Sequence, residues 1–137
     1  MIIVDAGFLY ALLDKRDAWH ERAAAAAPTV EEGWVTTWPA LTEATHLISN
    51  RLGNRFAQAL MDEVADGGVV AWDIPPGQVG RIPAMMQRYI SLPMDLADAS
   101  LVLLADHLGH GRILTTDQRD FGAYRWKNRQ PFNNLLA

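Results

Sequence analysis

Acidic residues that are far apart in the chain occupy positions from which they could act on one bound ion. Asp5 ends the apolar run MIIVD, and Asp117 ends the run RILTTD. Glu43 lies in the first turns of the helix expected after WVTT. Asp95 and Asp98, one helical turn apart, open the stretch PMDLADASLVLLADHLG, whose middle has no polar face. Two negative charges at the start of a helix that is otherwise predicted to be buried indicate a role beyond folding.

Carboxylates that converge on one place repel one another. Two of them about 4 Å apart repel by about 4 kcal/mol at an effective dielectric constant near 20, whereas a helix dipole stabilises each acid by only about 0.3–1 kcal/mol. Several converging acids therefore need either raised pKa values or a cation. Because the chain has no cysteine, the ligands would be oxygen atoms, which favour Mg²⁺ or Mn²⁺. Such ions polarise a phosphoryl oxygen and activate water, so the predicted chemistry is metal-assisted hydrolysis.

Each acid, taken singly, also has an ordinary structural explanation. Asp5 could cap the helix that follows it, and Asp117 could cap a turn through Asp120. Glu43 could be a solvated helix residue, and the acids that open the apolar helix could complement its dipole. Glu43 also forms a Glu-x-x-His pair with His46, but a di-iron site needs a second such motif. His46 is therefore predicted to pack within the fold or beside the site.

The elements that would position the acids alternate between strands and helices. Apolar, β-branched runs predict strands at 1–5, 33–38, 69–74 and 112–117, with a possible edge strand at 123–126. Helical patterns with suitable caps and stops predict helices at 6–14, 17–27, 39–53, 54–68, 84–90 and 93–109. This alternation implies crossover connections and a three-layer α/β/α sandwich, whose mostly parallel central sheet has four or five strands.

The topology predicts where the acids meet. In a parallel sheet of this kind, ligands bind beyond the carboxyl ends of the strands. Asp5 and Asp117 end strands, and Glu43 begins the helix that follows a third strand. The apolar helix runs toward the start of the strand at 112–117, so its first residues, including Asp98, lie at the same edge. All four acids are predicted to meet there.

Composition sets further bounds. The chain has 137 residues, half of them hydrophobic, which predicts one domain over 1–137. No apolar stretch approaches the roughly 20 residues of a membrane span, and no leader is visible, while the lack of cysteine suits the cytoplasm. The net charge of −4 argues weakly against nucleic acid. From Arg112 onward, however, the chain has five basic residues and only two acidic ones, so its C-terminal part carries a positive net charge.

The segments IIVDAG, TE, MDLADASLVLLA and ILTTDQRDF together resemble the PIN-domain ribonucleases, and most of all the VapC-type toxins of bacterial toxin–antitoxin modules. The resemblance covers nearly the whole chain in the right order, and DLADAS and TTDQRDF are its most specific parts. It implies an acidic Mg²⁺ or Mn²⁺ site made of Asp5, Glu43, Asp98 and Asp117. It also implies that this site cuts single-stranded RNA or an exposed RNA loop.

The resemblance implies supporting residues and partners as well. Asp95 matches an acid common in these sequences and is expected to belong to the metal site as support rather than as a first ligand. Thr116 matches a small hydroxyl residue that often hydrogen-bonds within the site, and Asp120 matches an acid with a structural role. Members of this family are usually cytoplasmic homodimers. A small antitoxin protein wraps around the toxin and inserts an arginine or another side chain into its acidic pocket.

Two other functions compete with this interpretation. The same fold could serve as a catalytically silent PIN-like module that binds RNA or protein, although the complete set of four acids argues against it. A phosphoacceptor α/β domain would need an acidic neighbour of Asp5 and a late lysine at a strand end. The late strand ends instead in Asp117, so this alternative is disfavoured.

The five tryptophans divide into two predicted groups. Trp34, Trp38 and Trp72 lie in or beside strands and are predicted to be mostly core, with Trp38 close enough to Glu43 to border the cleft. The other two, at positions 19 and 126, are predicted to be exposed. An exposed aromatic residue can stack on a nucleobase or anchor a protein interface, and the interface is the favoured role.

Overall fold

A parallel sheet forms the centre of the fold. The computed structural model describes residues 1–136, and its main sheet has five strands in the order β3–β2–β1–β4–β7. Every pairing recorded in this sheet is parallel. The strands are β1 (Ile2–Val4), β2 (Trp34–Thr37), β3 (Val69–Trp72), β4 (Arg112–Leu114) and β7 (Asn133–Asn134). The predicted sheet type and strand number are confirmed.

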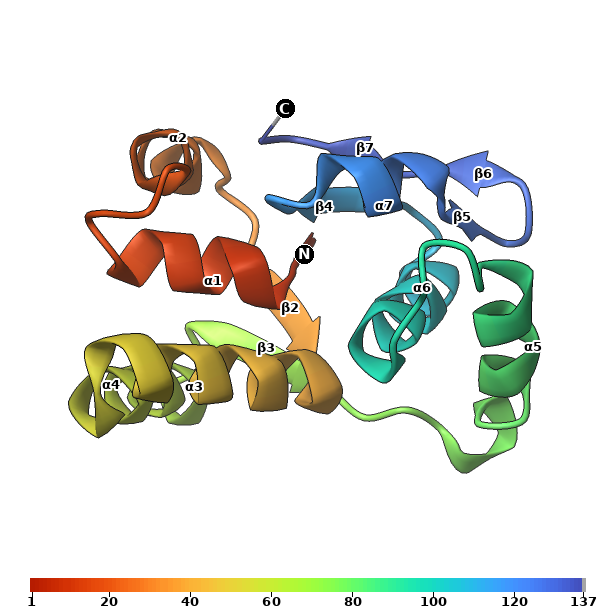
Figure 1. Cartoon of the computed structure of the whole chain (residues 1–137), viewed down its shortest axis with the longest axis horizontal. Helices are drawn as coiled ribbons and strands as arrows, with labels where there is room; N and C mark the ends of the chain where they lie inside the picture. Colours follow the sequence, from red (N-terminus) through yellow and green to blue (C-terminus); the bar gives the residue numbers. More distant parts are fainter. Residues whose placement is uncertain (137) are drawn as a thin grey trace.

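Helices connect the strands and cover both faces of the sheet. They are α1 (Ala6–Leu13), α2 (His20–Ala26), α3 (Trp38–Leu52), α4 (Asn54–Ala65), α5 (Arg81–Arg88), α6 (Leu96–Leu108) and α7 (Gln118–Ala123). Short 3₁₀ helices lie after α2, at Ala27–Thr29, and between β3 and α5, at Pro76–Gln78. Figure 1 shows α1, α3 and α4 on one side of the molecule and α5 and α6 on the other. The fold is therefore the predicted α/β/α sandwich.

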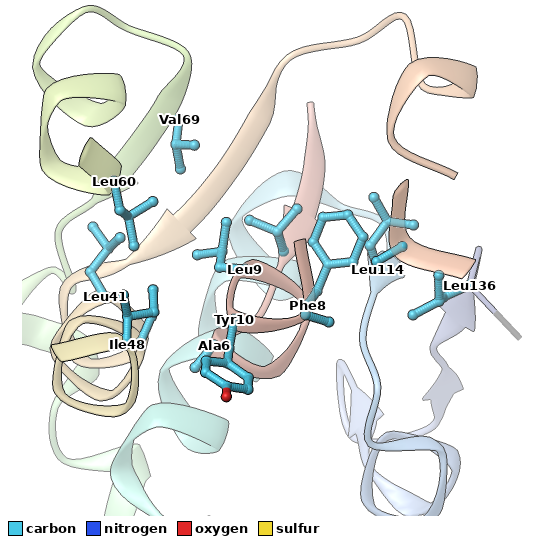
Figure 2. Close-up of a cluster of buried hydrophobic side chains, with 14 of the residues drawn as sticks. Ala6, Phe8, Leu9, Tyr10, Leu41, Ile48, Leu60, Val69, Leu114 and Leu136 are labelled. Carbon is cyan, nitrogen blue, oxygen red and sulfur yellow. The ribbon is translucent and has the colours of Figure 1, made fainter. Parts of the chain in front are cut away.

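The core has two halves because successive side chains of a strand point to opposite faces of the sheet. Ile2 and Val4 pack in one cluster with side chains of α1 to α4, and Ile3 packs in the other with α5 and α6. Figure 2 shows the first cluster, in which residues of α1, α3 and α4 meet. In residues 1–136, no helix combines the length and apolar character that crossing a membrane requires.

Side-chain caps begin the helices at the carboxyl edge of the sheet. Asp5 accepts a hydrogen bond from the Phe8 amide at 2.8 Å and so caps α1. The corresponding caps are Thr37 for α3, Asp95 for α6 and Asp117 for α7. The capping roles considered from sequence are thus present. They do not exclude ion binding, because each carboxylate has about four lone-pair sites.

The structure corrects the predictions for the C-terminal segment. Residues 123–126 do not form an edge strand of the main sheet, because β5 (Arg125–Trp126) pairs antiparallel with β6 (Gln130–Pro131) in a separate hairpin. Lys127 and Asn128, at φ values of 47° and 64°, make its tight turn. The edge strand is β7 instead, next to β4. Helix α7 was also not predicted.

The exposure of the tryptophans also differs from the prediction. Trp19 and Trp126 are half-buried and pack against the two core clusters, so their predicted exposure is wrong. Trp34 and Trp72 are half-buried core neighbours. Trp38 is the exposed member of the group, with 45% of its surface accessible.

Candidate active site

One cavity brings together the four acids on which the sequence prediction rested. Its volume is about 180 Å³, and Asp5, Glu43, Asp98 and Asp117 all line it. They come from the end of β1, from α3, from the first turn of α6 and from the residue that caps α7. Parallel strands and the helices that follow them place all four at the same edge of the sheet. The acids are therefore neighbours in space, although up to 112 positions separate them in sequence.

Asp5 is the most buried member of the set, with 7% of its surface exposed. One carboxylate oxygen accepts the Phe8 amide, and the other accepts the hydroxyl of Thr115. Burial raises the pKa of Asp5 to about 6, although these two hydrogen bonds act to lower it. Repulsion from Asp117 and Glu43 adds to the rise. A carboxyl group in this position gains from a nearby positive charge.

Asp98 is the second strongly perturbed acid. Burial raises its pKa to about 7, and repulsion from Asp95, Glu43 and Asp117 acts in the same direction. The Tyr124 hydroxyl donates a hydrogen bond of 2.8 Å to Oδ2 of Asp98, which opposes the rise. Oδ1 accepts no hydrogen bond from residues 1–136, so it is free to face a ligand.

Glu43 and Asp117 complete the cavity. Burial raises the pKa of Glu43, and the charges of Asp95 and Asp117 raise it further. Glu43 accepts no hydrogen bond from the described part of the chain. Burial also raises the pKa of Asp117, which caps α7 by accepting the Asp120 amide at 3.0 Å. The four carboxyl groups thus share one electrostatic environment that disfavours their full ionisation.

Asp95 and Thr116 have different places from the four acids. Asp95 lies outside the cavity lining, caps α6 through a 2.8 Å bond from the Asp98 amide, and raises the pKa of Glu43 by its charge. Thr116 lines the cavity, where its hydroxyl lies so close to Gly7 that a β-carbon at position 7 would collide with it. The roles expected for Asp95 and Thr116 stay predictions.

Two residues of this site were not found from the sequence. The hydroxyl of Thr115, which is fully buried, donates to Asp5 and accepts the Asp117 amide at 2.9 Å, so it ties two acids together. Tyr124 is also fully buried and holds Asp98. The TT pair in RILTTD was a usable signal for a hydroxyl residue but did not say which threonine. Tyr124 carries no local signal, since its contact arises only from packing.

The chemistry of the donor set fits a hard divalent cation, because all four groups are carboxylates and no thiolate is present. As the side chains stand, no group of three His, Asp or Glu residues within 1–136 is gathered closely enough to hold a metal ion. Side-chain rotations are needed to bring three oxygens to one centre. Repulsion between these carboxylates contributes to their raised pKa values, and a bound cation would offset that repulsion.

Comparison with known proteins adds independent information. The chain is 26% identical over 127 residues to ribonuclease VapC26 of Mycobacterium tuberculosis, an alignment that covers 90% of this chain and 92% of the relative. The crystal structure of VapC20 from the same organism, described as a toxin that cleaves the sarcin–ricin loop, superposes with a TM-score of 0.80.

The resemblance to VapC-type PIN domains is confirmed. The superposition on VapC20 covers 87% of this chain and 92% of that one, at 20% identity, and so shows the fold alone. No family model matches the sequence. The sheet order accounts for the approach of two of the acids, because β1 and β4 lie side by side. Asp5 directly follows β1, and Asp117 lies three residues after the end of β4.

Proposed function

We propose that this chain is a metal-dependent endoribonuclease that hydrolyses phosphodiester bonds in single-stranded or loop RNA. The observation that carries the proposal is the convergence of Asp5, Glu43, Asp98 and Asp117 on one cavity at the carboxyl edge of a PIN-type sheet. The likeness to VapC26, which is named a ribonuclease, supports the same substrate class.

These acids would hold Mg²⁺ or Mn²⁺. When bound, the ion supplies charge stabilisation for the phosphoryl oxygens and a more acidic water molecule. Thr115 fixes the orientation of Asp5, and Tyr124 fixes that of Asp98. The carboxylate of Glu43 accepts no hydrogen bond from the described residues, so it is free to turn toward the bound ion or its water molecule.

The biological role follows from the same family likeness. We propose that the chain is the toxin of a type II toxin–antitoxin pair, acts in the cytoplasm as a homodimer and is inhibited by a cognate antitoxin. A basic side chain of the antitoxin entering the cavity would neutralise the repulsion among the acids and exclude the cation. The catalytically silent alternative finds no support in the cavity, because all four acids are present and line it.

The test is a cleavage assay on single-stranded RNA and on RNA hairpins, with Mg²⁺ and Mn²⁺ titrated against a chelator. Asp5→Asn keeps the cap of α1, since asparagine is an equally good cap, but removes the charge. We expect at least about a 100-fold loss of activity. Asp62→Asn changes an exposed acid on α4 and serves as the matched control. Equal cleavage by Asp5→Asn, or none by the unmodified protein on any RNA, would contradict the proposal.

A further inference from the structure

A second, larger hollow adjoins the acid cavity. Its volume is about 680 Å³, and its walls come from the start of α3 and the start of α6, including Trp38, Thr42, His46 and Leu96. Glu43 lines both the hollow and the acid cavity. A chain whose phosphate lies at the acids therefore has this hollow directly beside it.

Exposed apolar side chains share the walls of the hollow with the polar residues Thr42, Glu43, His46 and Asp95. Trp38 is 45% exposed and Leu96 is 49% exposed, although both side chains are large and hydrophobic. Trp38 is the first residue of α3, directly after the capping residue Thr37. The buried hydroxyl of Thr37 hydrogen-bonds to that of Ser100 at 2.6 Å, which joins the start of α3 to α6. The backbone of Trp38 is thus held at a defined position relative to α6.

The charges of the residues that line the hollow favour some ligands over others. Within residues 1–136, no lysine or arginine lines it, so it does not suit a phosphate group. A protein surface seated over it would bury the carboxylates of Glu43 and Asp95, which is costly unless that surface brings a cationic side chain to each. A nucleobase is neutral, flat and small, and it can stack on an indole ring while those carboxylates stay solvated.

We propose that Trp38, with Leu96, forms a subsite for one unpaired nucleobase of the RNA, next to the phosphodiester that is cleaved. This inference rests on the proposed ribonuclease function and adds a substrate contact to it. The subsite would favour RNA that is single-stranded or looped at the cut, since a paired base must first be unpaired and unstacked to enter the hollow.

The experiment compares the unmodified protein with Trp38→Ala, Trp38→Phe and Phe56→Ala on a short single-stranded RNA. Phe56 is the matched control, because it is an exposed aromatic residue, 42% accessible, on α4 and outside the hollow. We expect Trp38→Ala to raise KM by about 5- to 150-fold and to change kcat less. Trp38→Phe should recover most of the loss, and Phe56→Ala should have no effect.

Abasic nucleotides then locate the contact. For the unmodified protein, removing one base beside the cut should raise KM as much as Trp38→Ala does. Combining the abasic RNA with Trp38→Ala should raise KM no further. An unchanged KM for Trp38→Ala would overturn the subsite while leaving the ribonuclease intact. A shift in sedimentation caused by Trp38→Ala would overturn it in favour of an interface between copies.

A separate binding measurement distinguishes failure of the subsite from failure of the proposed function. Nucleoside monophosphates are titrated into the unmodified protein and into Trp38→Phe while tryptophan fluorescence is recorded in a chelator. Quenching that depends on Trp38 supports the subsite even if no RNA is cleaved. If RNA is cleaved but this quenching is absent, the subsite is wrong and the ribonuclease stands.

Discussion

Tyr124→Phe tests whether a residue other than the four acids contributes to ion binding by orienting one of them. The substitution removes one oxygen atom, which donates a hydrogen bond of 2.8 Å to Asp98. The ring should stay in place, because it packs edge-on against Tyr89 at 5.0 Å and Phe121 at 5.1 Å. The variant therefore separates the orientation of Asp98 from the packing of the core.

The expected magnitude follows from the role of that hydrogen bond. No other described residue donates to the Asp98 carboxylate, so Tyr124 alone holds its orientation. Residues that orient metal ligands change metal affinity or activity by about 10- to 100-fold when they are removed, or about 1.4–2.7 kcal/mol. Asp98 is half-exposed, so water can replace the lost donor and the free energy of unfolding without metal should change little.

The assay is calorimetric titration of Mn²⁺ and Mg²⁺, followed by RNA cleavage across the same concentrations. Tyr10→Phe is the matched control, since it removes the hydroxyl of a buried tyrosine that donates to Asp14, a carboxylate that does not line the cavity. We expect weaker ion binding and slower cleavage at low Mg²⁺ for Tyr124→Phe alone. The reasoning is refuted if both variants bind the ion as tightly as the unmodified protein.

Three further predictions concern the acids and their nearest support. Thr115→Val keeps the side-chain shape but deletes two buried hydrogen bonds, so urea unfolding should show a loss of about 1–3 kcal/mol; an unchanged midpoint would mean that the hydroxyl is dispensable. Without metal, stability should fall as pH rises from about 4 to 7. The folded-state pKa values of Asp5, about 6, and Asp98, about 7, exceed the ordinary aspartate value of 3.8, so the folded protein holds more protons than the unfolded chain. Thermal unfolding at pH 5 and pH 8 checks this, and a rise toward pH 8 would contradict it. Asp98→Asn should abolish cleavage yet flatten that pH dependence and spare or raise the thermal midpoint without metal, whereas a large loss of stability would favour a purely structural role for this acid.

The sheet and the meeting of the acids were predictable because they follow from short-range pattern and topology. Runs of apolar, β-branched residues located β1 to β4, and the rule that ligands lie at the carboxyl edge placed Asp5, Glu43, Asp98 and Asp117 together. The strand ends were less certain: β4 stops at Leu114, and the backbone N–H and C=O of Thr115 pair with the Asn134 side chain instead of with a neighbouring strand.

The contacts that support the acids were not predictable, since they arise from packing between distant segments. Thr115 meets Asp5 across 110 positions and Tyr124 meets Asp98 across 26, and neither pair has a local signature. The edge strand β7 has only two residues and is fixed by side-chain bonds from Asn134 to the backbone of Thr115. A pattern of hydrophobic residues does not encode such a strand.

The exposure of Trp38 shows the same limit. Its position beside a strand predicted burial, yet the ring lies at the start of α3 and faces the hollow between α3 and α6. The relative placement of these two helices, to which the Thr37–Ser100 hydrogen bond contributes, leaves the Trp38 ring exposed.

The most direct test of the central claim is a crystal structure of the protein grown with Mn²⁺, with the ion located by its anomalous scattering. The proposed site predicts a peak inside the acid cavity, at roughly 2.0–2.3 Å from carboxylate oxygens that include those of Asp5 and Asp98. A peak only elsewhere, or none in crystals that hold Mn²⁺ at concentrations sufficient for cleavage in solution, would contradict it.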